Sequence, residues 1–167
     1  MANPQNMNFL SPHNFEFVIE RLPELSFFVQ DANIPDLIMG QAVTGTPFSQ
    51  LPLPGDQIIF GNLDISFKVN EDMSNWQELY TWIKQLGFPE SFEDRNVVDS
   101  SKPGYGLTSE ASLIIRTNAN NPNKKITFTG LFPVALGGLQ FTTQTTDVAE
   151  ITTSASFRYG TYSISDA

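Results

Sequence analysis

Hydrophobic and polar positions change their period within residues 62–87, and this change predicts a strand followed by a helix. From Leu63 onward, apolar residues alternate with polar ones, as in a half-buried strand. After Asn70 the spacing becomes helical, with Ser74 suited to cap the start of the helix and Gly87 suited to end it. The apolar stripe expected to pack this helix on a sheet consists of Trp76, Leu79, Tyr80, Ile83 and Leu86.

Alternating segments elsewhere predict more strands, linked mostly by hairpins. Residues 14–21 and 25–31 are expected to pair around a turn at Pro23. A second hairpin is expected from residues 111–117 and 126–131, because a polar Asn-rich turn separates them. The last strands are expected at 139–143 and 150–162, with loops at 88–106 and 132–139. The pattern predicts a mainly β fold: an antiparallel sandwich or barrel with one docked α-helix and a long protruding β-arm.

Residues 36–61 do not follow either period well. They combine many apolar residues with prolines and glycines and contain very few charges. Such a stretch is too apolar to stay disordered in water, and a long unpatterned connection is usually functional. We therefore predict a two-stranded inter-subunit arm that is buried against a neighbouring chain. Its anchor residues are expected to be Leu37, Ile38, Met39, Val43, Phe48, Leu51 and Leu53.

Length and charge narrow the function classes. The 167 residues suit a single domain, 1–167, preceded by a flexible N-terminal arm at residues 1–13. A net charge of −9 argues against general nucleic-acid binding, because phosphate contacts require Lys and Arg. The chain has no Cys, no apolar run of membrane-spanning length and no signal-peptide pattern at its start.

Catalytic chemistry has little support in the sequence. His13 is the only histidine, and it has no Cys or second His with which to form a metal or nucleophile site. The acidic residues of the loop at 88–106 lack the spacing of a calcium loop; they are Glu90, Glu93, Asp94 and Asp99. No phosphate-binding loop or nucleophile elbow is present. We therefore expect a protein that is not an enzyme and that needs no cofactor or metal.

An apolar arm on a low-charge β domain has to be covered. Identical subunits arranged head to tail around a ring can cover it, and ring closure also pairs the exposed edges of the sheet. The sequence therefore favours self-assembly.

The order of segments resembles the tail-tube proteins of contractile-tailed bacteriophages, which are related to type VI secretion tube proteins. The resemblance runs through residues 14–162. It includes the arm that closes at Pro54-Gly55-Asp56, the strand and helix with Trp76 and Trp82, the stretch Ile126-Thr-Phe-Thr-Gly-Leu-Phe-Pro133, and the following Gly137, Leu139 and Phe141. The loop at 88–110 and the Asn-rich leader have no counterpart in it.

This resemblance implies a structural role in a virion tail that is assembled in the host cytoplasm. Hexameric rings would stack into a hollow tube, with tail sheath and baseplate proteins as partners and no membrane. DNA would pass through the lumen without specific binding, because six chains at −9 carry about −54 per ring and repel phosphate. The candidate lumen-facing acids are Glu16, Glu20 and Asp64. The arm would reach the next ring, and the polar side of the helix would face the sheath or solvent.

Two alternatives stay open. The first is a tube-like baseplate or tail-terminator protein. The second, from a different class, is a monomeric carbohydrate-binding β-sandwich with a sugar site near Trp82 and Tyr105. Rings or tubes in electron micrographs would favour assembly, whereas discrete small particles would favour the binding module.

Overall fold

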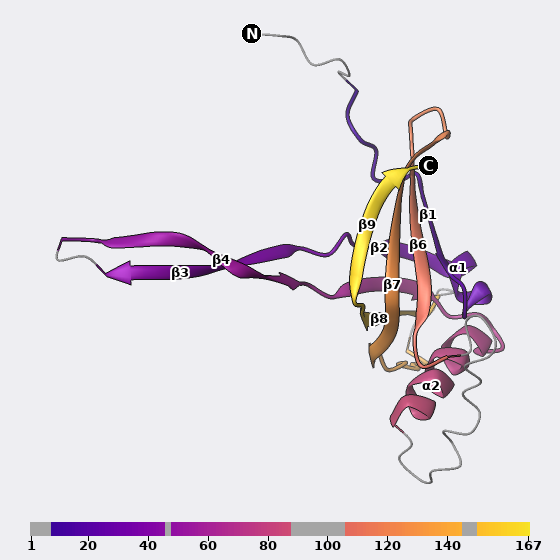
Figure 1. Ribbon diagram of the computed structural model, residues 1–167. Coiled ribbons are helices and arrows are strands. Elements are labelled where there is room, and N and C mark those ends of the chain that lie inside the picture. Colours follow the sequence, from indigo (N-terminus) through magenta and orange to yellow (C-terminus); the bar gives the residue numbers. More distant parts are fainter. Residues whose placement is uncertain (1–7, 46–47, 88–105, 145–149) are drawn as a thin grey trace.

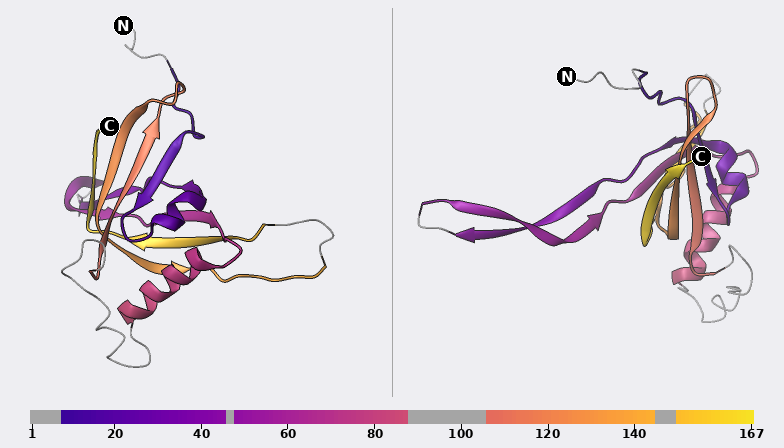
Figure 2. Two further views of the ribbon diagram at one scale, coloured as in Figure 1. Left: turned by 90° about the vertical axis from the view of Figure 1, so that its right-hand side faces the viewer. Right: turned by 45° about the horizontal axis from the view of Figure 1, so that its top comes forward.

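The computed structural model describes residues 8–45, 48–87, 106–144 and 150–167. In these residues the chain forms two antiparallel sheets joined by a long strand, β7 (Pro122–Leu136), and a separate two-stranded arm that projects from the body (Figures 1 and 2). The other strands are β1 (Phe15–Ile19), β2 (Val29–Ala32), β3 (Leu37–Gly45), β4 (Gln50–Phe60), β5 (Leu63–Lys68), β6 (Ser109–Arg116), β8 (Thr152–Arg158) and β9 (Thr161–Asp166). The mainly β, antiparallel class expected from the sequence is confirmed.

Strand β7 belongs to both sheets. Its first part lies between β6 and β9, which gives the order β1-β6-β7-β9. Its second part pairs with β8, which gives the order β7-β8-β5-β2. Gly130, where the two parts meet, has φ +68°, a conformation that favours glycine over residues with a side chain. The prediction of a loop at 132–139 is wrong for its first half, because the strand continues through the buried Pro133 to Leu136.

The core lies between the two sheets and the helices. Alternate residues of β1, β5, β6, β7 and β8 point into it, and Phe17, Phe67, Phe128 and Phe157 are each at most 2% exposed. This alternation is the predicted period of two, and it makes the intervening polar residues the outer faces of the sheets. Full burial of side chains of this size stabilises the fold by about 1.5–3 kcal/mol each.

The N-terminal hairpin expected at residues 14–31 is wrong. A short helix, α1 (Pro23–Phe28), replaces the start of its second strand, and only β2 remains extended. Pro23 supplies the backbone angle that suits the first helical turn, and Leu25 is fully buried. Strands β1 and β2 pair with β6 and β5 instead of with each other. The fold therefore has two described helices where one was expected.

Helix α2 (Ser74–Gly87) begins and ends where the sequence predicted, but its buried face differs. Leu79 and Trp82 are buried, with Trp76 and Leu86 partly buried against the core. Trp82 was not part of the predicted stripe. Tyr80 belonged to that stripe, yet its side chain is 49% exposed and stacks on the Trp76 ring at a centroid distance of 5.5 Å.

Ile83, the remaining member of the predicted stripe, is half-buried and lies outside the core cluster.

The hydrogen bonds at the start of α2 also differ from the predicted cap, in which Ser74 caps the helix. The Ser74 hydroxyl donates to Glu24 on α1 at 2.7 Å and accepts from the Asn70 amide at 2.6 Å. Instead, the side-chain amide oxygen (Oδ1) of the buried Asn75 accepts a hydrogen bond from the backbone N–H of Trp76 at 2.8 Å.

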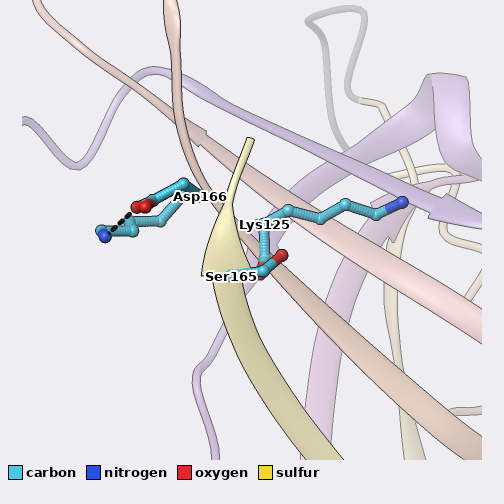
Figure 3. Close-up of polar contacts among 4 residues, drawn as sticks. Lys125, Ser165 and Asp166 are labelled. Carbon is cyan, nitrogen blue, oxygen red and sulfur yellow. Dashed lines mark hydrogen bonds and ion pairs between the residues drawn. The ribbon is translucent and has the colours of Figure 1, made fainter.

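The C-terminal region contains two further corrections. Residues 139–143 are not a strand, and the long strand expected at 150–162 is divided into β8 and β9 by Tyr159 and Gly160. Strand β9 is held at its end by an ion pair between Lys124 and Asp166 and by a hydrogen bond from the Ser165 hydroxyl to the Lys125 carbonyl at 3.4 Å (Figure 3). The predicted loop at 88–106 lies almost entirely outside the described residues.

Candidate assembly surface

The arm consists of β3 and β4 paired with each other alone. Ile38 is opposite Ile59 and Met39 is opposite Ile58 near the body, whereas Ala42 is opposite Leu53 farther out. Neither strand pairs with another strand in the described residues, and the arm projects with no other described element beside it in Figure 1 and in the right-hand view of Figure 2. The two-stranded, Pro-containing arm expected at residues 36–61 is therefore present.

Its register shifts at a bulge near the middle. Met39 pairs with Ile58 and Gln41 pairs with Pro54, so one residue on β3 is opposite three on β4. Within the bulge, Gly40 and Gly55 bring their backbones into close contact. The ribbons cross in Figure 1 near the middle of the arm. Pro54 borders the bulge, whereas Pro52 lies in the regular ladder opposite Val43. Proline cannot donate to a ladder, but it is tolerated on an edge strand, and both strands of a two-stranded arm are edges.

Apolar side chains on this arm are exposed to solvent in the isolated chain. All seven predicted anchor residues are exposed. Their exposed fractions are 55% for Leu37, 53% for Ile38, 54% for Met39, 56% for Val43, 98% for Phe48, 53% for Leu51 and 44% for Leu53. Soluble monomers rarely leave a continuous apolar surface of this kind uncovered. We call these residues, together with Ile58 and Ile59, the arm surface.

Ile58 and Ile59 were missing from the predicted anchors, although both are more than half exposed. They are consecutive on β4, so they point to opposite faces of the arm. Each faces an apolar partner on β3, which makes both faces of the inner arm apolar. The signal in the sequence was the pair of adjacent isoleucines, which cannot both face a single core. Asp56 is the only charged residue between positions 37 and 60.

The root of the arm is fixed to the body by an aromatic cluster. The ring of Phe60 lies 5.9 Å from those of Tyr159 and Tyr162, and Phe128 lies 5.2 Å from Tyr159 (centroid distances). The Arg158 guanidinium donates to the carbonyl of Phe60 at 3.4 Å. Aromatic pairs at these separations contribute about 0.5–1.5 kcal/mol each beyond their burial. The direction of the arm is therefore set by side chains of the body.

Tyr159 in this cluster has an unusual hydroxyl. Its oxygen is buried and has no hydrogen-bond partner among the described residues. Burial raises the pKa of the Tyr159 phenol, and the neighbouring Tyr162 and Asp36 add to this increase. The hydroxyl is therefore neutral and stays so, which keeps the cluster apolar.

The three candidate lumen acids do not share one surface. Glu16 is on the outer face of β1, in the first sheet, where it forms an ion pair with Arg116, and Glu20 is exposed in the turn directly after that strand. Asp64 is on the outer face of β5, in the second sheet, and accepts a hydrogen bond from the Ser156 hydroxyl. A single lumen surface formed by one sheet can therefore include either the pair or Asp64.

Other candidate chemistry is sparse in the described part of the chain. His13 is exposed, and no group of three or more metal-ligating side chains occurs among the described residues. Trp82 is 1% exposed beneath the Arg21 guanidinium, so it offers no open face for a sugar ring. Tyr105, the other residue of that hypothesis, and the acidic residues Glu90 to Asp99 lie outside the described residues. No helix in the described ranges is long and apolar enough to cross a membrane.

Comparison with known proteins finds similarity in fold. No protein-family model and no curated protein matches the sequence. Among solved structures, the anti-feeding prophage cap, described as a tube-terminating cap, matches with a TM-score of 0.64 and 13% identity over 99% of this chain and 97% of that one. A chain of the sheath–tube complex of an extracellular contractile injection system matches at 0.61 and 10% identity, over 96% and 94% of the two chains.

Hcp1 from Flavobacterium johnsoniae matches at 0.52 and 14% identity, over 95% of this chain and 97% of that one. At these identities the matches establish the fold and no more. The chain thus has the fold found in tube-associated proteins of contractile injection systems and in Hcp1, and the resemblance to tail-tube proteins seen in the sequence is confirmed at the level of fold.

Proposed function

We propose that this protein is a structural subunit of the tube of a phage tail or phage-like contractile particle, and that it assembles as hexameric rings that stack. The observation that carries the proposal is the arm surface, which extends apolar residues on both faces away from the body. An apolar surface of this shape requires a protein partner, and copies of the same chain provide one at fixed geometry. The fold supports the proposal, because structures with this fold come from a tube cap and a sheath–tube complex.

The second sheet supports ring closure. In the order β7-β8-β5-β2 every pair is antiparallel, so the two edge strands of this four-stranded sheet run in opposite directions. Copies placed head to tail therefore continue the antiparallel alternation, with β2 of one copy beside β7 of the next. Such closure would remove both unpaired edges. The geometry of this sheet suits a continuous inner barrel.

In this arrangement the outer face of the second sheet would line the lumen. Asp64 would face the lumen together with the hydroxyl side chains of Ser66, Ser154 and Ser156, which follow the same alternation. Glu16 and Glu20, on the other sheet, would not. The same alternation places Lys68, which forms an ion pair with Glu150, and Arg158 on this face. Its charges are therefore mixed, and DNA or another anionic cargo would meet no extended basic surface.

A tube-terminating cap is the second candidate. It is favoured by one specific observation, the match to the anti-feeding prophage cap over nearly the full length of both chains. The two functions differ in what the arm contacts. A tube subunit repeats the same arm contact in each ring, whereas a cap makes it on one side only.

Electron microscopy of the purified full-length chain tests both. Rings and stacked tubes are expected for a tube subunit, single rings for a cap, and small discrete particles would contradict both. A double variant, Leu51→Ser with Leu53→Ser, is expected to abolish stacking while the body stays folded. Leu107→Ser is the matched control, because Leu107 is similarly exposed, at 49%, but lies on the body. Loss of stacking in the control variant would show that the arm surface is not the decisive contact.

A further inference from the structure

The open edges of the sheets are not equally protected. The ring closure proposed above uses the edges of β2 and β7. Among the described strands, this leaves the edges of β1 and β9 in the first sheet and of β3 and β4 in the arm. An open edge presents N–H and C=O groups to any other strand, so proteins usually cover it or interrupt it. Here β1 and β4 are protected in this way, whereas β9 and β3 are not.

The two protected edges use different devices. Helix α1 covers β1, where the Ile19 N–H donates to the Ser26 hydroxyl oxygen at 3.2 Å and Phe17 is 2% exposed. On β4, Pro52 lies opposite Val43 in the ladder of the arm. Because proline has no N–H, this is a non-hydrogen-bonded pair, and the main-chain groups of both residues face the outer edges of the arm. Pro52 therefore removes a donor from the outer edge of β4.

The edge of β9 is open to solvent. This strand pairs with β7 on one side, contains no proline, and carries Asp166 as its single charged residue. The Ala167 N–H donates to the carbonyl of Asn123, so the alternation of the ladder turns the main-chain groups of Tyr162 and Ile164 away from β7. Ile164 is 60% exposed. A strand of another molecule can therefore reach this edge.

The outer edge of β3 is equally open. The strand contains no proline and no charged residue, and every residue in it except Gly40 is exposed. The main-chain groups of Val43 face outward, as its pairing with Pro52 requires. Strand β3 therefore combines an uninterrupted edge with the apolar side chains of the arm surface.

We infer that β3 of one copy pairs with the open edge of β9 of a neighbouring copy, so that the arm adds one strand to the first sheet of its neighbour. The inference rests on the proposed function, because it takes the arm contact to lie between copies of this chain. It adds the receiving strand and the kind of contact, in which main-chain hydrogen bonds accompany the apolar side chains. Within one chain the two strands do not pair, and the arm projects away from the body (Figure 1).

A contact between unlike strands agrees with a growing assembly. Pairing of β9 with β9, or of β3 with β3, is symmetric and closes after two copies. Pairing of β9 with β3 uses a different edge on each side, so a copy that has formed one contact keeps an edge for the next. It also places the apolar arm beside Ile164, which is otherwise exposed.

Proline substitution at an outward-facing position tests the main-chain contact. It removes one N–H from the open edge and leaves the ladder on the other side of the strand intact. Ile164→Pro does this on β9, and Val43→Pro does it on β3. The matched controls are Ile164→Ala and Val43→Ala, which shorten the same side chains but keep the N–H. In electron micrographs of the full-length chain, we expect both proline variants to lose stacking and both alanine variants to retain it.

Stacking by Ile164→Pro at the level of Ile164→Ala would overturn the inference. A mixture of the two proline variants tests which strands pair. Ile164→Pro keeps an intact β3 and Val43→Pro keeps an intact β9, so a contact forms between the two variants and cannot continue beyond them. We expect single rings from each variant alone and pairs of rings from the mixture. Stacking by Val43→Pro alone would show that β9 does not need the arm, and would also overturn the inference.

Amide hydrogen exchange separates this inference from the proposed function and does not depend on the folding of a proline variant. The Ile164 N–H faces away from β7, so it should exchange slowly in wild-type tubes and rapidly in Val43→Ala once that variant is diluted until it dissociates. Rapid exchange of this N–H in wild-type tubes would overturn the inference and leave the proposed function standing. A wild type that stays monomeric would contradict both.

Discussion

The main-chain oxygen of Gly40 occupies the space that a side chain on Gly55 would need: a Cβ placed on Gly55 would lie 2.5 Å from that oxygen. The contact is between two backbones, so neither side can move away as a flexible side chain would. It lies in the bulge at the middle of the arm, where the register of β3 and β4 changes. The two glycines therefore define the shape of the outer arm.

We predict that Gly55→Ala distorts the arm without unfolding the body. The added methyl group forces β3 and β4 apart at the bulge, and stacking in electron micrographs should be lost while the melting temperature of the body changes little. Gly45→Ala is the control, because a Cβ there meets no atom within 4 Å, although Gly45 is on the same arm. Stacking by Gly55→Ala at the wild-type level would show that the shape of the outer arm is not required.

Removal of the Tyr159 hydroxyl should not destabilise the fold. The oxygen is buried and has no hydrogen-bond partner in the part of the chain that the structure describes, so Tyr159→Phe removes a desolvated polar group while the ring and its aromatic contacts remain. We expect the free energy of unfolding in urea to stay the same or rise by about 1 kcal/mol. A decrease of 2 kcal/mol or more would indicate that this hydroxyl makes a stabilising hydrogen bond.

Glu78 predicts a pH-dependent change in stability. Burial and the Glu24 carboxylate raise the pKa of Glu78 above its ordinary value, so the fold favours the protonated carboxyl. The protonated Glu78 carboxyl therefore makes its full contribution to the stability of the wild type below the ordinary pKa of a glutamate. This contribution is lost as the pH rises through the raised pKa of Glu78 in the folded protein. Glu78→Gln should melt at a higher temperature than the wild type at about pH 7.5, and the difference should vanish near pH 3.5.

Glu71→Gln is the control for this effect, since Glu71 is exposed on the turn before the helix. The melting temperature of Glu71→Gln should equal that of the wild type at both pH values. If the stabilisation by Glu78→Gln were the same at both, altered packing rather than ionisation would account for it.

Phe157 is expected to be among the most costly core positions to truncate. It is fully buried on β8, and its ring lies 6.3 Å from the Trp82 ring of α2, centroid to centroid. Phe157→Ala should lower the free energy of unfolding by about 3–5 kcal/mol, measured in urea, because it removes transfer energy and leaves a cavity. Phe141→Ala, at a phenylalanine that is 73% exposed, should change it by less than about 0.5 kcal/mol.

The parts of the fold that local pattern determines were predictable from the sequence. The period of two in β5 and the helical spacing in α2 each depend on neighbours within the same element. The arm was also predictable, because a Pro- and Gly-rich stretch that is too apolar for solvent has few alternatives. The anchors Ile58 and Ile59 were missed although they lie within the arm predicted at residues 36–61.

Non-local contacts decided the rest. Leu22 and Leu25 fit a short helix as well as a turn and strand, and α1 forms because both are buried in the same core. Trp82 replaces Tyr80 on the buried face of α2 because Phe157 lies beneath it and Arg21 above it. The lumen acids were grouped by strand alternation, which cannot show that Glu16 and Asp64 belong to different sheets.

A mechanical property follows from the continuity of β7 across Gly130. Neighbouring strands separate when their ladder of hydrogen bonds is pulled apart, but the two halves of β7 are connected by peptide bonds. A force applied to one sheet reaches the other along an unbroken covalent backbone, so the two layers should resist being drawn apart along the length of this strand.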